Sequence, residues 1–476
     1  MPERIVIDPV TRIEGHAKIS IFLGDDGAVT DARFHVTEFR GFEKMFENRP
    51  FWEMPAICAR VCGICPVSHL TASAKAGDQI LAVRVPPAAV KLRRFANWAQ
   101  VLQSHALSFF HLSSPDLLLG MDSDPATRNV FGLIATNPEL ARAGIRLRQF
   151  GQRIIGALGG QKIHPAWVVP GGVRHSLPDE DKAWVRGRLP EVRQTTLTAI
   201  GLFKGLLEKF REEAEVFGKF PTMHLGLVGP DGTWETYDGN MRFCDADGKT
   251  VAEVDPARYK EFIAEKAESW SYIKSTVFKS LGHPDGIYRV GPLARLNVCD
   301  RMGTPLADRE FAEFRGMGRE AGNASFLFHY ARLIEILASI ERIDAMLDDP
   351  DLQSDHIRAE AGVNTLEGIG CCEAPRGILF HHYQVTGDGL IRTANLLIAT
   401  AQNNLAMNRT VAQIAKHYVR GRDIPEGILN RLEAGIRTFD PCLSCSTHAA
   451  GRMPLAVELV GADGEVIAER RRGSGA

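Results

Sequence analysis

The chain of 476 residues is long enough for two to four domains or for one large unit. Its 56 Lys and Arg residues nearly balance its 58 Asp and Glu residues, and the formal net charge of −2 excludes the basic field that non-specific nucleic-acid binding needs. No apolar run reaches the roughly 18 residues of a membrane span. The N-terminus carries acids and a proline where a signal peptide has basic and apolar regions, and the nine cysteines are odd in number and unevenly spaced. We therefore expect an intracellular chain with reduced thiols.

The first 37 residues predict β-strands, because short apolar runs flank a GDDG turn that is typical of a hairpin. From residue 86 onward the apolar residues recur at helical spacing up to residue 110. Similar long helical patterns cover residues 136–158, 189–217, 321–348 and 407–436. Helices of this length indicate a bundle with a shared core.

Further hairpins are predicted between and after the helices. A DADG turn joins two strand patterns within 222–256, a TGDG turn follows residue 376, and another hairpin lies in 449–476. No linker divides the chain into independent domains. We expect an α+β fold, mainly α, with a core bundle of long helices and peripheral β-hairpins.

Two C-x-x-C pairs carry the strongest chemical signal in the sequence. Cys62 and Cys65 lie in RVCGICPVSH (60–69), and Cys442 and Cys445 lie in DPCLSCSTH (440–448). Four thiolates form a soft ligand set for zinc, an iron–sulfur cluster, nickel or copper. For either pair alone, a redox dithiol or half of a zinc site explains the motif as well as a shared metal site does. The 376 residues between Cys65 and Cys442 far exceed the roughly 15–20 of a zinc ribbon, so we expect a catalytic site built from both chain ends.

Together with DPVTRIEGH (8–16), RGFE (40–43) and EAPRG (373–377), these motifs resemble the large, catalytic subunit of the nickel–iron hydrogenases. The resemblance spans nearly the whole chain and implies the large-subunit fold of that family. The two cysteine motifs look most like the bidirectional, cytoplasmic, NAD(P)-linked group. The resemblance thus implies reversible heterolytic cleavage of H2 to protons and electrons.

The resemblance implies that all four cysteines of the two pairs bind nickel. Cys65 and Cys445 would also bridge to an iron that carries carbon monoxide and cyanide ligands. Thiolates stabilise nickel in accessible redox states, which makes this ligand set chemically sensible.

Five residues receive catalytic roles from the resemblance. Cys442 would accept the proton from H2, and Glu14 would relay it outward, since a carboxylate near a thiolate is a suitable proton acceptor. Arg376 would extend its guanidinium over the open metal position. Asp116 and Asp440 would be the carboxylate partners of Arg376.

Further ligands are implied around the metal pair. Pro375 and Thr400 fall where the family packs against and hydrogen-bonds a cyanide ligand, although IATAQNN departs from the usual pattern there. Glu43, His448 and the backbone carbonyl of Leu396 match the ligands of a nearby site for Mg²⁺ or a similar divalent cation. The remaining cysteines match no metal position and are interpreted as buried structural thiols: Cys58, Cys244, Cys299, Cys371 and Cys372.

The resemblance also implies a processed subunit in a larger complex. A maturation endopeptidase would cut after His448, so that residues 1–448 form a single catalytic domain and 449–476 a removable extension. Nickel-insertion proteins would be further partners. The unassigned cysteines do not cluster into an electron relay, so a small iron–sulfur subunit is expected as a partner. GALGGQK (156–162) lacks the G-x-G-x-x-G spacing of a nucleotide-binding fingerprint, so NAD(P) is expected on other subunits. The resemblance implies diaphorase subunits that carry NAD(P), FMN and further iron–sulfur clusters.

Three alternatives remain beside this interpretation. The chain could serve a hydrogenase with another acceptor, such as a deazaflavin, a viologen-type acceptor or sulfur. It could be a non-catalytic relative of the quinone-site subunit of respiratory complex I, but that subunit lacks the metal-binding cysteines. A zinc-stabilised protein of other function is disfavoured by the long separation of the pairs.

Overall fold

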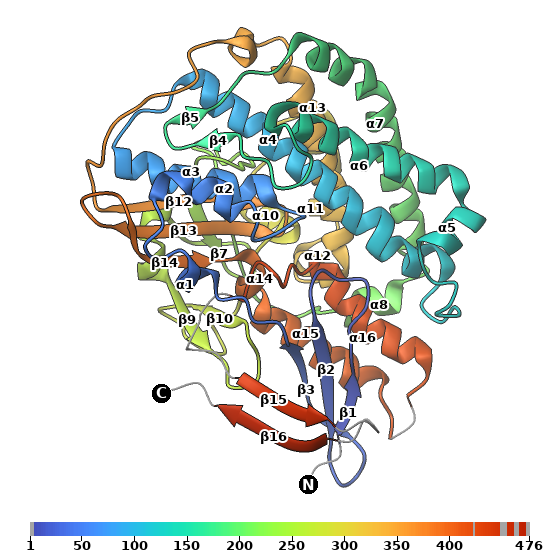
Figure 1. Cartoon of the computed structure of the whole chain (residues 1–476). Helices are drawn as coiled ribbons and strands as arrows, with labels where there is room; N and C mark the ends of the chain where they lie inside the picture. The colour runs from blue at the N-terminus through green and yellow to red at the C-terminus, as the bar shows by residue number, and fades with distance from the viewer. Residues whose placement is uncertain (1–3, 422–423, 448–454, 461–465, 473–476) are drawn as a thin grey trace.

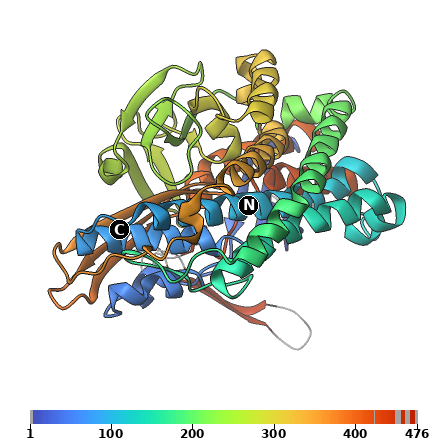
Figure 2. The same ribbon diagram turned by 90° about the horizontal axis from the view of Figure 1, so that it is seen from above.

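The computed structural model describes residues 4–421, 424–447, 455–460 and 466–472. Long helices pack against one another, and small sheets lie around them (Figure 1). From above (Figure 2), the strands between residues 223 and 289 gather on one side of these helices. The expected α+β, mainly α class is therefore confirmed. In the described part of the chain, no helix is both long and apolar enough to cross a membrane.

The longest helices agree with the helical periodicity of the sequence. They are α4 (Pro87–Ala106), α6 (Pro138–Gly159), α7 (Asp179–Leu206) and α13 (Phe328–Met346). Helix α7 begins ahead of the expected residue 189, because three acidic residues occupy its first turn, where the helix dipole favours negative charge. The end of that pattern, up to residue 217, forms the separate short helix α8 (Arg211–Val216).

The pattern over 407–436 is two helices and not one, which corrects the prediction. Helix α15 (Asn404–Tyr418) ends before Pro425, and α16 (Glu426–Phe439) begins directly after it. Proline lacks the amide hydrogen that a continuous helix needs and disfavours helical backbone in the residue before it.

One helix that positions the site was not predicted. Helix α3 (Pro66–Leu81) starts directly after Cys65 and is buried on nearly every side. Many of its buried residues are Ala, Ser or Gly, so few large apolar side chains mark it in the sequence. The remaining helices are shorter: α1 (Phe42–Met45), η1 (Phe51–Glu53), α2 (Met54–Cys58), η2 (Leu107–Ser113), η3 (Pro115–Leu119), α5 (Val130–Thr136), η4 (Pro256–Arg258), α9 (Tyr259–Phe262), α10 (Pro292–Val298), α11 (Pro305–Gly316), α12 (Arg319–Gly322), η5 (Ser325–Leu327), η6 (Pro350–Gln353) and α14 (Ala399–Gln402).

Every predicted hairpin is present. The strands are β1 (Arg4–Ile7), β2 (Ala17–Leu23), β3 (Val29–Val36), β4 (Val168–Val169), β5 (Gly172–Val173), β6 (Met223–Val228), β7 (Asn240–Cys244), β8 (Thr250–Val254), β9 (Ile263–Ala267), β10 (Lys274–Phe278), β11 (Tyr288–Arg289), β12 (Glu367–Ala374), β13 (Gly377–Val385), β14 (Ile391–Leu397), β15 (Leu455–Val460) and β16 (Val466–Arg472).

The sheet β12-β13-β14 is antiparallel. Helix α3 packs against β12 so closely that a Cβ at Gly370 would collide with the Ala72 carbonyl. Glycine at this position thus brings the helix that follows Cys65 onto the sheet.

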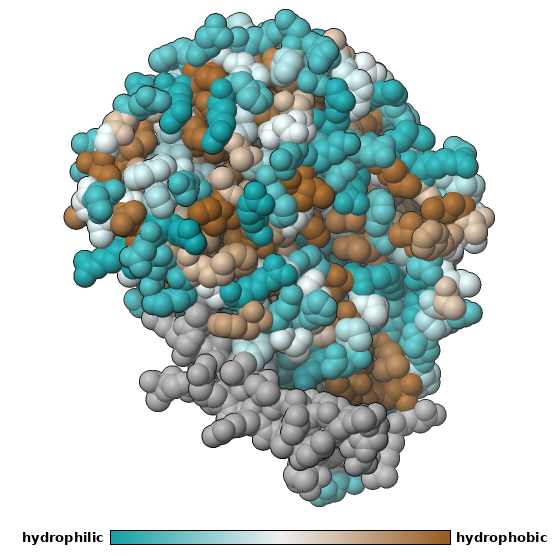
Figure 3. All heavy atoms as spheres, in the orientation of Figure 1, coloured by the Kyte–Doolittle hydropathy of each residue, from teal (hydrophilic) through white to brown (hydrophobic). Residues whose placement is uncertain are grey.

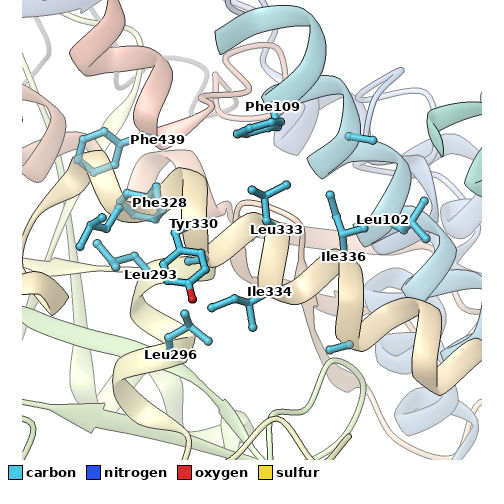
Figure 4. Close-up of a cluster of buried hydrophobic side chains, with 14 of the residues drawn as sticks. Leu102, Phe109, Leu293, Leu296, Phe328, Tyr330, Leu333, Ile334, Ile336 and Phe439 are labelled. Carbon is cyan, nitrogen blue, oxygen red and sulfur yellow. The ribbon is translucent and has the colours of Figure 1, made fainter. Parts of the chain in front are cut away.

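Helix α13 lies at the centre of the largest hydrophobic core (Figure 4). Leu333 points toward Phe109, while Ile334 points toward Leu296 of α10. All four side chains are buried, and each contributes roughly 1.5–3 kcal/mol relative to exposure. The core therefore joins the helices on both sides of α13.

Three fully buried histidines predict a fall in stability at mildly acidic pH. Burial lowers the pKa of His105 to about 4 and the pKa values of His224 and His329 to about 3. Below about pH 6.5 the unfolded chain binds protons at these rings and the folded chain does not, so the unfolding free energy falls by about 1.4 kcal/mol per pH unit for each ring. Burial raises the pKa of Glu373 to about 7, so the folded chain binds a proton at this carboxyl at a higher pH than the unfolded chain does. Glu373 therefore offsets the contribution of one of the three histidines to the pH dependence.

The histidine contribution is measurable by denaturant unfolding at several pH values between 4.5 and 6.5. His329→Leu, with leucine among the rings of Phe109, Phe203 and Phe326, is expected to make the pH slope shallower by about 1.4 kcal/mol per unit. A variant with the slope of the native chain would contradict the assignment.

Candidate metal centre

The two C-x-x-C pairs meet in the interior of the fold. Cys62 and Cys65 lie in the loop between α2 and α3, and Cys442 and Cys445 lie directly after α16. All four are buried, and their Sγ atoms lie within 4.8 Å of one another. The Sγ–Sγ distances are 3.0 Å for Cys62–Cys442, 3.5 Å for Cys65–Cys445 and 2.8 Å for Cys442–Cys445. Within the described residues, no other group of three or more potential metal ligands comes together.

These sulfur positions fit a shared metal. Two sulfurs that are each about 2.3 Å from one metal lie at most about 4.6 Å apart, close to the spread observed. The distances are too long for a disulfide, whose sulfurs are about 2.05 Å apart, and all nine cysteines are free thiols. The other five cysteines are also buried and stand apart from this group, as expected of structural thiols.

The ionisation of the four thiols also calls for a cation. Burial, followed by the hydrogen bonds to the neighbouring thiols, raises the pKa of Cys442 well above its usual value, and burial likewise raises the pKa of Cys445. Hydrogen bonds from Cys442, Cys445 and Cys62 lower the pKa of Cys65. Burial thus disfavours the thiolate forms of Cys442 and Cys445, and a soft metal ion would supply the missing positive charge.

Asp440 directs the second cysteine pair toward the first. It ends α16 in the left-handed conformation, with φ at 52°, and Pro441 prevents the helix from continuing. The chain then runs beside the N-terminal segment, where Glu14 and Cys442 form a parallel bridge. The half-buried Glu14 accepts the amide of Leu443 at its backbone oxygen, at 3.2 Å, and the amide of Ser444 at Oε2, at 3.0 Å. The predicted relay carboxylate is thus fixed to the loop that carries Cys442.

Arg376 and Asp440 form a buried pair next to the thiols. The two residues are the predicted partners, with Arg376 Nη2 2.9 Å from Asp440 Oδ2, and Arg376 Nε donates to the Asp440 carbonyl at 2.5 Å. Burial lowers the pKa of Arg376, but the charge of Asp440 and the neighbouring Cys442, Cys65 and Cys62 outweigh it and raise that pKa well above its usual value. Arg376 is therefore a permanent cation beside the sulfur cluster.

A small cavity adjoins the thiols on the side of Arg376. It is lined by Cys65, His69, Ala374, Arg376, Leu379, Ile398, Ala399, Thr400, Cys442 and Cys445. Apart from the sulfurs, Arg376, His69 and Thr400, its wall is apolar. The cavity suits a small uncharged ligand held between a metal and a cation.

Asp116 does not pair with Arg376, which corrects the prediction. It lies in η3, where its oxygens accept from Arg12 at 2.5 Å and 3.0 Å, from Arg437 at 2.8 Å and from Asn430 at 3.0 Å. Burial raises the pKa of Asp116, but the opposite effect of Arg437 and Arg12 is larger and keeps this pKa below its usual value. Asp116 thus anchors the segment of Arg12, two residues before Glu14, and not the guanidinium over the thiols.

The structure describes two of the three residues predicted to bind Mg²⁺ or a similar cation, Glu43 and Leu396. Glu43 Oε1 accepts the Leu396 amide at 2.9 Å and the ammonium of Lys274 at 3.1 Å. Leu396 lies on the edge strand β14, and its carbonyl points to the same side as its amide, away from β13. His448 lies outside the described residues. Lys274 also reaches Glu265 Oε1 and Asn395 Oδ1, so an internal cation already balances these acids.

Sequence reasoning missed three side chains at the site. Lys274 contacts Glu43, Ser104 Oγ lies 3.2 Å from Arg376 Nη1, and Arg295 donates to the carbonyls around Pro375. Ser104 and Arg295 lie on buried helices and Lys274 on a short strand, where no motif marks them. A buried arginine within an apolar run is the one signal that could have identified Arg295.

Thr400, predicted near a cyanide ligand, holds the backbone of the site. Its Oγ1 accepts the buried amide of Cys442 at 3.0 Å. Thr400→Val is expected to lower the unfolding free energy by about 1–3 kcal/mol, because this amide loses its partner. Urea unfolding measures the change.

The matched control is Thr410→Val on α15. Thr410 Oγ1 donates to the Ala406 carbonyl, which is also an acceptor within the helix, so this change leaves no buried amide without a partner. Equal losses for the two variants would contradict the role of Thr400.

Two family models match the chain. A model described as nickel-dependent hydrogenase matches residues 40–126 and 233–448. A model described as HoxL-like matches residues 4–39. The first model alone covers more than half of the chain and includes both cysteine pairs.

Characterised relatives are similar over the full length. The NAD-reducing hydrogenase HoxS subunit beta of Cupriavidus necator is 43% identical, with 99% of this chain and 100% of the relative covered. An F420-non-reducing hydrogenase subunit from Methanothermobacter thermautotrophicus is 41% identical, with 98% of this chain and 99% of the relative covered. A crystal structure of an NAD+-reducing [NiFe]-hydrogenase in the H2-reduced state superposes with a TM-score of 0.91 at 45% identity, covering 94% of this chain and 99% of that one.

Proposed function

The chain belongs to the nickel-dependent hydrogenase family, and on this premise we propose that it is the catalytic subunit of a complex that transfers electrons from H2 to NAD(P)+. The observation that carries the proposal is the buried group of four cysteine sulfurs within 4.8 Å, beside a cavity that faces Arg376. The full-length similarity to an NAD-reducing hydrogenase subunit supports the nicotinamide acceptor. When bound, a nickel–iron centre with carbon monoxide and cyanide on its iron would supply the polarisation of H2 and the redox change.

Cys62, Cys65, Cys442 and Cys445 would hold this centre through their sulfurs. Cys442 Sγ would accept the proton that H2 releases. Glu14 would receive that proton, since its backbone pairs with Cys442 and its carboxylate accepts a hydrogen bond from the Ser444 amide in the same loop. Proton transfer thus depends on the contact between the two ends of the chain.

Arg376 would orient the ligand in the cavity and keep water out of the space next to the sulfurs. Its ion pair with Asp440 holds the guanidinium in place without removing its charge. Thr400 and Pro375 would border the cyanide ligands. Thr400 lines the cavity, and Pro375 lies between the lining residues Ala374 and Arg376.

We further propose that Glu43, the Leu396 carbonyl and His448 bind Mg²⁺ or a similar cation. The carboxylate and the edge carbonyl are the hard oxygen ligands that such an ion prefers. Burial lowers the pKa of Lys274, but Glu265 and Glu43 outweigh it and raise it, so the lysine stays charged next to this site. A divalent cation would have to share these acids with the ammonium.

An iron–sulfur partner subunit would dock where the cysteines come nearest the surface. Gly63, between Cys62 and Cys65, is exposed, and so are Trp52 at 50% and Ile163 at 49%. A cavity of about 1300 Å³ lies in this region and includes Trp52 and Arg60. Hydrophobic patches also lie among polar ones on the face shown in Figure 3. Diaphorase subunits with FMN and NAD(P) would complete a cytoplasmic complex.

We propose that residues 449–476 are removed from the mature subunit by an endopeptidase that cuts after His448, once nickel-insertion proteins have acted. The Thr447 carbonyl is already held by the amides of Arg40 and Gly41, at 3.1 Å and 2.8 Å, so the segment before the cut is docked in the full-length chain. Mass spectrometry of active enzyme is expected to show a chain that ends at His448. An intact Ala476 in active enzyme would contradict the proposal.

The function is tested by H2-dependent reduction of NAD+ or NADP+ with the complete purified complex. We expect nicotinamide reduction under H2 and H2 evolution from the reduced nucleotide. Reduction of an artificial viologen but of neither nucleotide would refute the acceptor and leave the hydrogenase assignment. No H2-dependent reduction of any acceptor would refute both.

A further inference from the structure

Arg376 lies at the tip of a very tight hairpin. Strands β12 and β13 pair up to Ala374 and Gly377, so only Pro375 and Arg376 form the turn. The position of the guanidinium over the sulfurs therefore depends on where this two-residue tip lies. Something must fix the tip, because a misplacement of about 1 Å in a catalytic group can lower turnover a hundredfold.

Arg295, on α10, contacts the tip, and all five N–H groups of its guanidinium donate hydrogen bonds. It is fully buried. Three of its hydrogens go to carboxylates at 2.6 Å: Nε and Nη2 donate to Glu335, and Nη1 donates to Glu373. The remaining two go to the end of β12 and to the tip: Nη1 donates to the Ala374 carbonyl and Nη2 to the Pro375 carbonyl, both at 3.0 Å. All five donors of the arginine are thus used.

The surroundings of Arg295 fix it in turn. Glu335 also contacts His105 Nε2 at 2.8 Å, and Glu373 Oε1 accepts the Leu227 amide at 2.9 Å. The start of α10 packs on the same turn, since a Cβ at Gly291 would lie 2.7 Å from the Arg376 carbonyl oxygen. Helices α4, α10 and α13 and strand β6 thereby hold one guanidinium in one orientation.

We propose that Arg295 is a positioning residue for Arg376: its two carbonyl hydrogen bonds place the hairpin tip so that the Arg376 guanidinium faces the sulfur cluster. Lysine could not replace it, since an ammonium has three donors and no planar fork. The inference rests on the proposed function, because it assigns Arg295 to turnover through Arg376.

The test is a double-variant cycle in the complete complex, with turnover measured as H2-dependent viologen reduction per bound nickel. Arg295→Lys is expected to lower turnover roughly tenfold to hundredfold, because the tip loses its fixed position. In an Arg376→Lys background, the same change is expected to cause no further loss, since the group that it positions is already gone.

Arg289→Lys is the matched control. Arg289 is also fully buried, but it donates to the Gly218 and Asn323 carbonyls and not to the hairpin tip. Whatever loss it causes is expected to be the same in both backgrounds. Glu335→Gln serves as a second variant of the network if Arg295→Lys does not fold, with the same expectation as Arg295→Lys.

Equal losses from the Arg295 or Glu335 variant with and without Arg376 would overturn the inference, because they would show an effect that does not pass through Arg376. Normal turnover in Arg295→Lys would overturn it as well. Native enzyme without nickel or without turnover would instead refute the proposed function.

Discussion

Replacing Cys65 with serine is expected to leave the purified complex without its metals and without H2-dependent activity. Cys65 Sγ lies 3.5 Å from Cys445 Sγ in the four-sulfur group, and the residue directly precedes α3. A hydroxyl is a hard ligand that stays protonated at neutral pH, so it replaces a soft thiolate poorly. Nickel and iron analysis, together with H2-dependent viologen reduction, measures the loss.

Cys58→Ser is the matched control for this experiment. Cys58 is also buried and lies four residues before Cys62, but its sulfur contacts the Tyr383 hydroxyl at 3.3 Å and is outside the four-sulfur group. We expect full nickel content and a change in stability of about 1 kcal/mol. Full nickel and turnover in Cys65→Ser, or loss of nickel in Cys58→Ser, would contradict the ligand assignment.

Replacing Arg376 with lysine is expected to lower turnover about a hundredfold while nickel stays bound. The guanidinium lines the cavity next to the sulfurs and is fixed by Asp440 and Ser104. Removing a preorganised donor from a buried site costs roughly 10²–10³ in turnover. Lysine keeps the charge but not the planar fork that the ion pair uses.

Turnover per bound nickel is the quantity to measure, and Arg93→Lys is the control. Arg93 is likewise buried and paired with a carboxylate, Asp78, but does not line the cavity. A turnover for Arg376→Lys that equals the control would contradict the role assigned to Arg376.

Short motifs in the sequence predicted most of the residues of the site. The two C-x-x-C pairs identified the four sulfurs that meet in the structure. EAPRG identified Arg376, but the β12–β13 hairpin that carries it was not predicted. Such motifs work because the backbone spacing of a loop determines which side chains can reach one atom. The family resemblance implied Asp440 as a partner of Arg376, and the structure places Arg376 Nη2 2.9 Å from Asp440 Oδ2.

The rest depended on tertiary contacts that no spacing encodes. Asp116 was assigned to Arg376, but Arg12 and Arg437 reach it first from segments more than 100 residues away. Helix α3 was not predicted, because many of its buried residues are Ala, Ser or Gly and few large apolar side chains mark it in the sequence. Arg295 lacks a motif, and its role follows only from the five acceptor atoms around it, which belong to Glu335 and to the segment 373–375.

X-ray absorption at the nickel edge of the purified complex tests the central claim most directly, because it counts the atoms bound to nickel. The four buried sulfurs predict nickel in a shell made mainly of sulfur, with Cys62, Cys65, Cys442 and Cys445 as its ligands. A nickel shell of nitrogen and oxygen, or a sulfur site that holds zinc and no nickel, would contradict it.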